Sequence, residues 1–286
     1  MPEYPEVTIV RKTLQTEVKG SQIINVKIWD PKFIKNTNAK NFEEFIKGET
    51  IEDISNTGKF LVYHLSNNKR VISHLRMEGK YYLRDPKILE NYHYNHDYLY
   101  FYLNNGKVLA YNDTRKFGSF EIVKQEDEHK SISEIKNLAE LPGFVDVEKL
   151  YQKLSKSNKS IKTVLLDQSL ILGIGNIYAD ESLHLSKVYP MTKAKLISLE
   201  KLKEILQNAQ KIMDESIMLG GSSVHTYRAV NGVIGTFQNK LKVYGRAKKV
   251  CLQCKRAAIE KVKLDFKPNG RGTSFCPNCQ REKHEK

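Results

Sequence analysis

Long apolar runs, tryptophan and arginine are scarce in this sequence of 286 residues, and cysteine is confined to its last quarter. No stretch reaches the ~18 successive apolar residues of a membrane-spanning helix, which excludes a transmembrane protein. Residues 1–7 (MPEYPEV) include two acids and no apolar segment, which excludes a secretory signal peptide. Hydrophobic residues make up 40% of the chain and charged residues 28%, a composition typical of folded domains. We therefore expect a folded protein that stays in the cytoplasm.

Positive charge is in excess and is concentrated near the C-terminal end. Lys and Arg number 47 against 33 Asp and Glu, which gives a net charge of +14 at pH 7. Residues 236–286 contain 14 basic and 4 acidic residues and so carry +10 of that charge. A basic segment of this size indicates a polyanionic partner, nucleic acid first and an anionic membrane second; a solubilising surface is the alternative. Only 10 of the basic residues are Arg, so each Arg is a candidate for planar, bidentate recognition.

The four cysteines, Cys251, Cys254, Cys276 and Cys279, form two C-x2-C pairs with 21 residues between the pairs. Disulfides are rare in the cytoplasm, whereas two such pairs supply the four thiolates of a tetrahedral Zn²⁺ site. A redox-active dithiol and unligated thiols are the alternatives. The spacing predicts one structural zinc ion.

The segment between the cysteine pairs has the pattern of a β-hairpin. Residues 259–266 fit a strand, residues 268–270 (PNG) fit a turn, and residues 273–275 (TSF) fit a returning strand. We expect a zinc-bound β-hairpin.

The periodicity of the sequence changes along the chain, and its length is about twice that of a typical domain of ~150 residues. Apolar residues recur at helical spacing over residues 5–18, and short β-type segments follow until about residue 123. From about residue 145 the period is helical again. Strands are expected at 22–29, 59–65, 70–75, 98–103, 107–111 and 119–123, and further helices at 41–47, 148–155, 160–167, 176–186 and 198–219.

These elements predict an α+β fold. The closely spaced strands indicate a β-sandwich or a barrel with flanking helices, and residues 125–134 are polar enough for a linker. We expect an N-terminal β-sandwich domain at residues 1–130, a linker at 131–147, a helical domain at 148–235 and the zinc hairpin at 236–286.

Residues 173–178 (GIGNIY) form a glycine turn between two predicted helices. A dinucleotide-binding loop is excluded, because the third glycine is missing and no strand precedes the turn. Backbone N–H groups at a helix start still suit a phosphate, although an ordinary helix–helix turn explains the pattern equally well.

The first residues allow covalent chemistry. If Met1 is removed, Pro2 becomes a free secondary amine; an α-amine has a pKa of about 7.7–8.0, so about a tenth of it is neutral near pH 7. Such an amine attacks electrophilic carbon to form an iminium ion, with Glu3 and Glu6 near enough to move protons. A plain helix start is the alternative, which these residues alone favour.

Several segments, in order from residue 1 to residue 280, closely resemble those of the formamidopyrimidine-DNA glycosylases. They are MPEYPEV at 1–7, NTGKFL at 56–61, HLRMEG at 74–79, NDTRKFG at 112–118, LDQ at 166–168 with GIGNIYADE at 173–181, and GRGTSFCPNCQ at 270–280. The resemblance implies a helix–two-turns–helix motif around the glycine turn, followed by a zinc finger.

This resemblance implies a base-excision repair enzyme that is both a DNA glycosylase and an AP lyase. Such enzymes act on double-stranded DNA with oxidised bases or abasic sites, remove oxidised purines such as 8-oxoguanine and formamidopyrimidines, and nick the strand by β,δ-elimination. It implies Pro2 as the nucleophile that forms a Schiff base with the sugar, Glu3 as the acid that moves protons, and Glu6 as a residue that holds the amine and the substrate. It also implies a bacterial, nucleoid-associated monomer without a membrane partner.

The resemblance further implies contacts with the phosphates around the extruded nucleotide. Lys59 and Arg271, which belong to the catalytic set, and Asn176 match these positions, and they supply a point charge, a guanidinium fork and an amide. The hairpin between Cys254 and Arg271 is longer than is usual in the family.

Three other residues match those that fill the void left by the extruded base: Met77, Arg115 and Phe117. The spacing of Arg115 and Phe117 places both side chains on one face of an extended segment. Thr114 stands where family members often carry proline. The loop at residues 220–236 occupies the region that covers the flipped base in the family.

Two alternatives remain open. One is the sister class that excises oxidised pyrimidines by the same N-terminal proline chemistry; Arg115, Phe117 and residues 4–6 (YPE) favour the purine class. The other is a non-catalytic zinc-ribbon DNA-binding protein, which would not need Pro2 and Glu3 together.

Overall fold

The computed structural model describes residues 2–222 and 235–281, and the chain divides into two compact units. The first unit contains Met1–Ile135 and Leu219–Thr236, and the second contains Lys136–Met218 and Phe237–Lys286. By their contacts, the described residues 219–222 and 235–236 thus belong with the N-terminal unit. The domain boundaries expected at residues 130, 147 and 235 stay a prediction, since spatial compactness alone does not define a domain.

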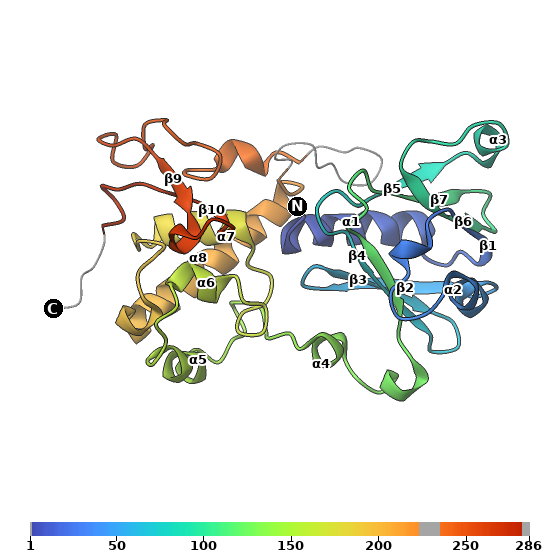
Figure 1. Cartoon of the computed structure of the whole chain (residues 1–286). Coiled ribbons are helices and arrows are strands. Elements are labelled where there is room, and N and C mark those ends of the chain that lie inside the picture. The colour runs from blue at the N-terminus through green and yellow to red at the C-terminus, as the bar shows by residue number, and fades with distance from the viewer. Residues whose placement is uncertain (1, 223–234, 282–286) are drawn as a thin grey trace. The chain divides into compact units, whose positions relative to one another are not determined.

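The first unit is an antiparallel β-sandwich with α1 running along it (Figure 1). Sheet I has the strand order β1-β6-β7-β5, and sheet II has the order β2-β3-β4-β8. This arrangement confirms the predicted sandwich. The strands are β1 (Ile23–Ile28), β2 (Ile51–Thr57), β3 (Phe60–Leu65), β4 (Arg70–His74), β5 (Lys80–Arg84), β6 (Asp97–Leu103), β7 (Val108–Asn112) and β8 (Ser119–Ile122), and the helices are α1 (Tyr4–Val18), α2 (Ala39–Ile46), α3 (Pro86–Leu89) and α4 (Ile132–Lys136).

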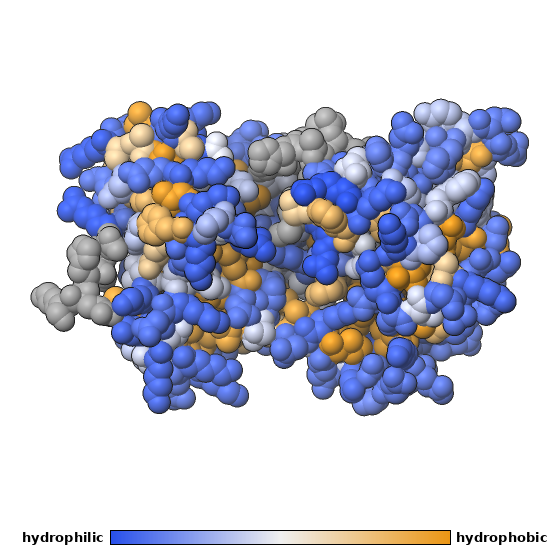
Figure 2. Space-filling model, viewed as in Figure 1, coloured by the Kyte–Doolittle hydropathy of each residue, from blue (hydrophilic) through white to orange (hydrophobic). Residues whose placement is uncertain are grey.

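Helix α1 closes the core of this unit. Val7, Val10, Leu14 and Val18 recur at helical spacing, are buried, and join one apolar cluster with side chains from both sheets. Pro5 fits the first turn because its missing N–H would have no partner there. On the face drawn in Figure 2, hydrophilic residues cover most of the surface of each unit. Among the described residues, no helix is both long and apolar enough to cross a membrane.

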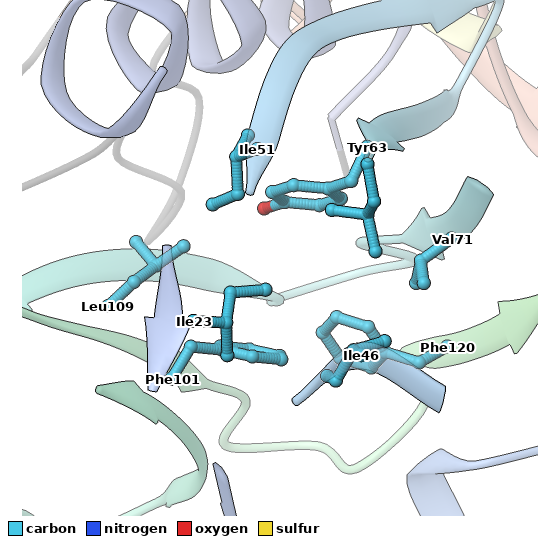
Figure 3. A pocket seen from close by; sticks show the side chains of 9 residues that line it. Ile23, Ile46, Ile51, Tyr63, Val71, Phe101, Leu109 and Phe120 are labelled. Carbon is cyan, nitrogen blue, oxygen red and sulfur yellow. The ribbon is translucent and has the colours of Figure 1, made fainter. Parts of the chain in front are cut away.

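A small cavity of about 20 Å³ lies inside the sandwich (Figure 3). The side chains of Ile46, Phe101 and Phe120 pack around it, and Tyr63 brings the one polar group of its lining. A buried water needs two to four polar partners, so this space is a packing void and not a ligand site.

Two strands that the sequence analysis did not predict complete the sheets: β2 and β5. The predicted linker at 125–134 is also partly ordered, with a 3₁₀ turn at Gln125–Asp127. Ile132, at the start of α4, then packs in a small apolar cluster with Val62, Ile72 and Val123.

In its described residues, 136–218 and 237–281, the second unit has four α-helices and a two-stranded sheet. Helix α7 packs on α8 and on β10, and α5 packs on α8. The glycine turn lies between α6 and α7, and Gly173 has a φ of 87°, which favours glycine. The elements are α5 (Val147–Leu154), α6 (Ile161–Leu165), α7 (Asn176–Leu185), α8 (Leu199–Met218), β9 (Glu260–Lys263) and β10 (Gly272–Phe275).

The C-terminal hairpin is shorter than predicted. Strand β9 ends at Lys263, so the expected strand over residues 259–266 is wrong at its end. Leu264–Phe266 form a 3₁₀ turn in which Asp265 and Phe266 both have a φ of 53°. The chain turns here because Leu264 is buried and its N–H donates to the carbonyl of Arg271, which closes the hairpin end.

Candidate active site and nucleic-acid interface

Reciprocal hydrogen bonds fix the start of α1. The N–H of Glu3 donates to Oε2 of Glu6 at 2.9 Å, while the side chain of Glu3 accepts from the N–H of Glu6. The other oxygen of Glu6 accepts from the N–H of Ser222 at 2.8 Å. Glu3 and Glu6 are only 2% and 3% exposed, and Pro2 is buried beside them. This capping box therefore holds Pro2 and Glu3 in one position.

The loop that carries Lys59 is fixed to the same helix. Lys59 follows Gly58 in the turn between β2 and β3, where Gly58 has a φ of 55°. The amide of Asn56 donates both to the carbonyl of Gly58 and to Oγ1 of Thr8 on α1, each at 3.2 Å. Lys59 thus lies at the end of the sandwich where α1 begins.

Two loops cross from one sheet to the other at that end. Residues 75–79 connect β4 to β5, and residues 113–118 connect β7 to β8. In sheet II, β4 pairs with β8 through His74 and Ser119, and in sheet I, β5 pairs with β7 through Lys80 and Asn112. Met77 lies on the first loop, and Arg115 and Phe117 lie on the second. The pairing brings these three predicted residues to neighbouring loops.

Both loops approach the hydroxyl of Tyr111 closely. A Cβ atom at Gly79 would lie 2.3 Å from this oxygen, and one at Gly118 would lie 1.7 Å from it. Glycine is therefore required at both positions, because a side chain would force the loops apart. This contact explains glycines that the sequence analysis left without a role.

A single carboxylate organises the loop of Arg115. Asp113 is fully buried, and its two oxygens accept four backbone N–H groups at 2.8–3.1 Å, from Arg115, Lys116, Phe117 and Gly118. The segment is therefore a tight turn, with a φ of 56° at Lys116, and the expected extended segment is wrong.

The turn nevertheless brings Arg115 and Phe117 together. The guanidinium carbon of Arg115 lies 4.8 Å from the ring centroid of Phe117, and Phe117 is 53% exposed. An exposed ring with a cation on its face suits stacking against a base.

In the second unit, Asn176 and Arg271 are brought to one place. Asn176 begins α7, and its amide donates to the carbonyl of Gly272 at 3.0 Å, next to the exposed Arg271. Gln168 braces the glycine turn that precedes α7, since its amide donates to the carbonyl of Ile174 and accepts from the N–H of Gly173.

A buried ion pair fastens the hairpin to these helices. Nζ of Lys162 lies 2.6 Å from Oδ1 of Asp180 and donates to the carbonyl of Gly272 and to Oγ1 of Thr273. The other oxygen of Asp180 accepts from the N–H of Ser274. Burial raises the pKa of the Asp180 carboxyl, and Lys162 opposes that rise.

The four cysteine sulfur atoms form one cluster, with all of them within 4.8 Å of one another. Cys254 and Cys276 are 3.6 Å apart, and Cys251 and Cys279 are 3.9 Å apart. The N–H of Arg256 lowers the pKa of the Cys254 thiol to about 6, whereas burial raises the pKa of Cys276 and of Cys279. The cluster has the donor set and the size of a metal site.

Two models of known protein domains match this chain, one in its N-terminal part and one in its C-terminal part. The Formamidopyrimidine-DNA glycosylase N-terminal domain matches residues 1–120, and the Formamidopyrimidine-DNA glycosylase H2TH domain matches residues 141–228. The chain belongs to the formamidopyrimidine-DNA glycosylase family. Membership confirms the resemblance seen in the sequence and the predicted enzyme class, a DNA glycosylase.

Relatives cover nearly the whole length of the chain. It is 45% identical over 283 residues to the formamidopyrimidine-DNA glycosylase of Mycoplasmopsis pulmonis, with 99% of each chain covered. It is 42% identical over 282 residues to that of Ureaplasma parvum, with 98% of this chain and all of the relative covered. The Lactococcus lactis Fpg in complex with abasic-site DNA has a TM-score of 0.89 at 36% identity, over 98% of this chain and 100% of that one.

Against this family background, the predicted residues fall into two sets. The first unit gathers seven of them at one end of the sandwich: Pro2, Glu3, Glu6, Lys59, Met77, Arg115 and Phe117. The second unit brings Asn176 close to Arg271 and holds the four cysteines in a cluster of their own. Most of the loop expected at 220–236 lies outside the described residues.

Several supporting residues were missed, among them Asp113, Lys162 and Asp180. Asp113 stands before a turn-forming segment, and Lys162 is a lone charge on an otherwise apolar helix face; both are sequence signals that could have found them.

Replacing Asp113 with Ala should lower the free energy of unfolding of the first unit by about 3 kcal/mol, because four loop N–H groups lose their acceptor. Trp29, the one tryptophan of the chain, lies in this unit, so its fluorescence during urea unfolding reports the change. The matched control is Asp85→Ala, which removes an exposed N-cap that accepts one N–H and should cost about 1 kcal/mol or less. Equal losses for both variants would show that Asp113 does not organise the loop.

Proposed function

We propose that this protein removes oxidised purines from double-stranded DNA through a Schiff base on Pro2 and then nicks the strand by β,δ-elimination. The observation that carries the proposal is the buried start of α1, where Glu6 holds Glu3 and Pro2 in place. A helix start without chemistry has no need to bury two carboxylates beside a proline.

The chemistry of Pro2 follows from this environment. Once Met1 is removed, Pro2 carries a secondary amine; burial and the positive end of the α1 dipole both favour its neutral, nucleophilic form. The nitrogen attacks C1′ as the bond between C1′ and the damaged base breaks; the base leaves with the electrons of that bond and takes up the proton that the amine nitrogen gives up. Glu3 protonates the ring oxygen of the sugar, which opens, and the electrons of the amine complete an iminium ion.

Lys59, Asn176 and Arg271 are proposed to bind the phosphates around the extruded nucleotide. One N–H of the Asn176 amide is used on the hairpin backbone, which leaves its second N–H for a phosphate oxygen. Arg271 is exposed, and its planar fork suits two phosphate oxygens. Lys59 would supply a point charge next to the helix that carries Pro2.

Met77, Arg115 and Phe117 are proposed to fill the void in the duplex. Extruding a base costs a few kcal/mol of stacking, which an inserted side chain offsets in part. The exposed Phe117 ring is fit to stack, and Arg115, held against it, offers N–H donors to the unpaired opposite base.

One structural zinc ion is proposed for the cysteine cluster. Tetrahedral zinc with Zn–S bonds of about 2.3 Å places its sulfur atoms about 3.8 Å apart. Two of the six sulfur–sulfur distances, 3.6 and 3.9 Å, bracket that value, and all six are within 4.8 Å. Four thiolates leave no open coordination position, so the ion would stabilise the finger and take no part in the reaction.

Duplex DNA as the substrate would place the protein at the nucleoid, in the cytoplasm.

Incision assays on three duplexes test the substrate class. Met-free, zinc-loaded protein should cut duplexes containing 8-oxoguanine or a formamidopyrimidine purine at least about tenfold faster than one containing an oxidised pyrimidine. β,δ-Elimination should leave phosphate at both ends of the gap. Faster cutting of the oxidised pyrimidine would assign the protein to the sister class, and binding of all duplexes without cutting would support a non-catalytic DNA-binding protein.

A further inference from the structure

A histidine that the mechanism does not use lies against the cysteine cluster. His184, in the last turn of α7, is 2% exposed, and its Nε2 lies 3.6 Å from Sγ of Cys251. The imidazole does not belong to the group of four ligand atoms. His184 is therefore placed to contact a ligand of the metal and not the metal itself.

The same face of α7 holds the chain that leads to Cys251. Glu181, one turn before His184, accepts the N–H groups of Lys242, Val243 and Tyr244 at 2.8–2.9 Å. Helix α7 thus contacts the finger at two points, the segment before the first cysteine and that cysteine. A position three residues after Glu181 faces the same side of the helix.

The chemistry of the contact fixes its direction. A metal-bound cysteine is a thiolate, which accepts hydrogen bonds and has no proton to donate. A neutral imidazole has one N–H and one bare nitrogen, and an imidazolium has an N–H on both nitrogens. The contact is therefore a hydrogen bond only when Nε2 carries the proton.

We propose that His184 is a positioning residue for the zinc site, and that it donates its Nε2–H to the thiolate of Cys251 and so slows the loss of the metal. This inference rests on the zinc assignment made above. A four-thiolate zinc site carries a net charge of −2, and a donor aimed at one sulfur offsets part of that charge and holds the sulfur in its direction. Loss of such an outer contact typically weakens metal binding by about 10- to 100-fold.

Three variants separate the hydrogen bond from packing. In His184→Gln the amide nitrogen is as many bonds from Cβ as Nε2, so the donor is kept. In His184→Asn the amide nitrogen takes the place of Nδ1, and in His184→Phe the ring is kept without a donor. With zinc content first measured by mass spectrometry, release to an excess of chelator should be about tenfold faster for the Asn and Phe variants and within about threefold of the parent for Gln.

Cobalt provides a second measurement that packing alone would not move. A hydrogen bond stabilises the sulfur lone pair, so its loss should shift the sulfur-to-cobalt charge-transfer band to longer wavelength in the Asn and Phe variants but not in Gln. If the parent holds one zinc and all variants match it in release rate and band position, His184 is not a positioning residue. If the parent holds no zinc and gives no thiolate–cobalt band, the zinc assignment itself is wrong.

Discussion

Borohydride should link the Met-free protein covalently to a duplex containing 8-oxoguanine, with the adduct on the peptide of residues 2–11. The secondary amine of Pro2 forms a bond to C1′ as the base leaves, and the hydride reduces the resulting iminium ion to a stable amine. Denaturing gels detect the cross-link, and mass spectrometry of tryptic peptides locates it. An adduct on Lys59 instead would leave a lyase with a different nucleophile.

Two substitutions at the start of α1 test the separate roles of Pro2 and Glu3. Pro2→Gly still offers an amine after removal of Met1, so it should retain partial cross-linking. Glu3→Gln should bind lesion DNA normally but release the base about 10³-fold more slowly, because the amide cannot transfer the proton. The Gln oxygen can still accept the N–H of Glu6, so the capping box and the helix start are kept.

The matched control for Glu3→Gln is Glu44→Gln, which changes an exposed carboxylate on α2 in the same unit. Its excision rate should equal that of the parent, and Trp29 fluorescence should show both variants folded. Normal excision by Glu3→Gln would remove Glu3 from the reaction. Intact mass of the purified chain comes first, because a retained Met1 blocks the amine of Pro2.

The parts of the fold that the sequence predicted are those with a regular apolar period. Helix α1 buries Val7, Val10 and Leu14 at the spacing that a helix demands. Strand β2 was missed because its register shifts between Ile51 and Asp53, so the buried Ile51 and Ile54 are three residues apart and the period of two is lost.

The sequence analysis did not predict strand β5 and misplaced the end of β9, for other reasons. In β5 only Tyr81 is buried, and one residue gives no period. After β9, Leu264 and Phe266 look alike in sequence, but Leu264 is buried and Phe266 is 70% exposed. The left-handed backbone at Asp265 that separates them comes from closure of the hairpin, which no local pattern records.

The residues of the candidate site also divide into those that a sequence pattern predicted and those that it did not. The cysteine spacing alone predicted the cluster, since four ligands in two pairs have few other uses. Pro2 and Glu3 needed the family resemblance, because a proline and an acid begin many helices. Asp113 and Lys162 carry local sequence signals, but they and His184 act through partners that are remote in the chain or belong to the backbone, so these partners became visible only in three dimensions.

Replacing Cys254 with Ser, or removing the proposed zinc ion, should weaken DNA binding by at least about 100-fold while the first unit stays folded. The finger has only a small core, formed by Val243, Cys251, Ile259 and Cys276, and a two-stranded sheet of this size rarely folds without its metal. Its collapse would release Arg271 and the hairpin carbonyl that Asn176 contacts. The +10 charge of residues 236–281 would then no longer be held in one arrangement for the phosphates.

Two measurements distinguish this collapse from the loss of one contact. Arg271→Ala keeps the cysteines, so it should retain zinc and reduce the slope of log affinity against log salt by about one, whereas Cys254→Ser should reduce the slope by several. Trp29 belongs to the first unit, so its fluorescence should be unchanged in both variants. Returning zinc to the metal-free parent should restore binding, and it should not do so for Cys254→Ser. Full DNA binding by protein verified as metal-free would mean that the finger holds its shape through Glu181, Lys162 and Asp180 alone.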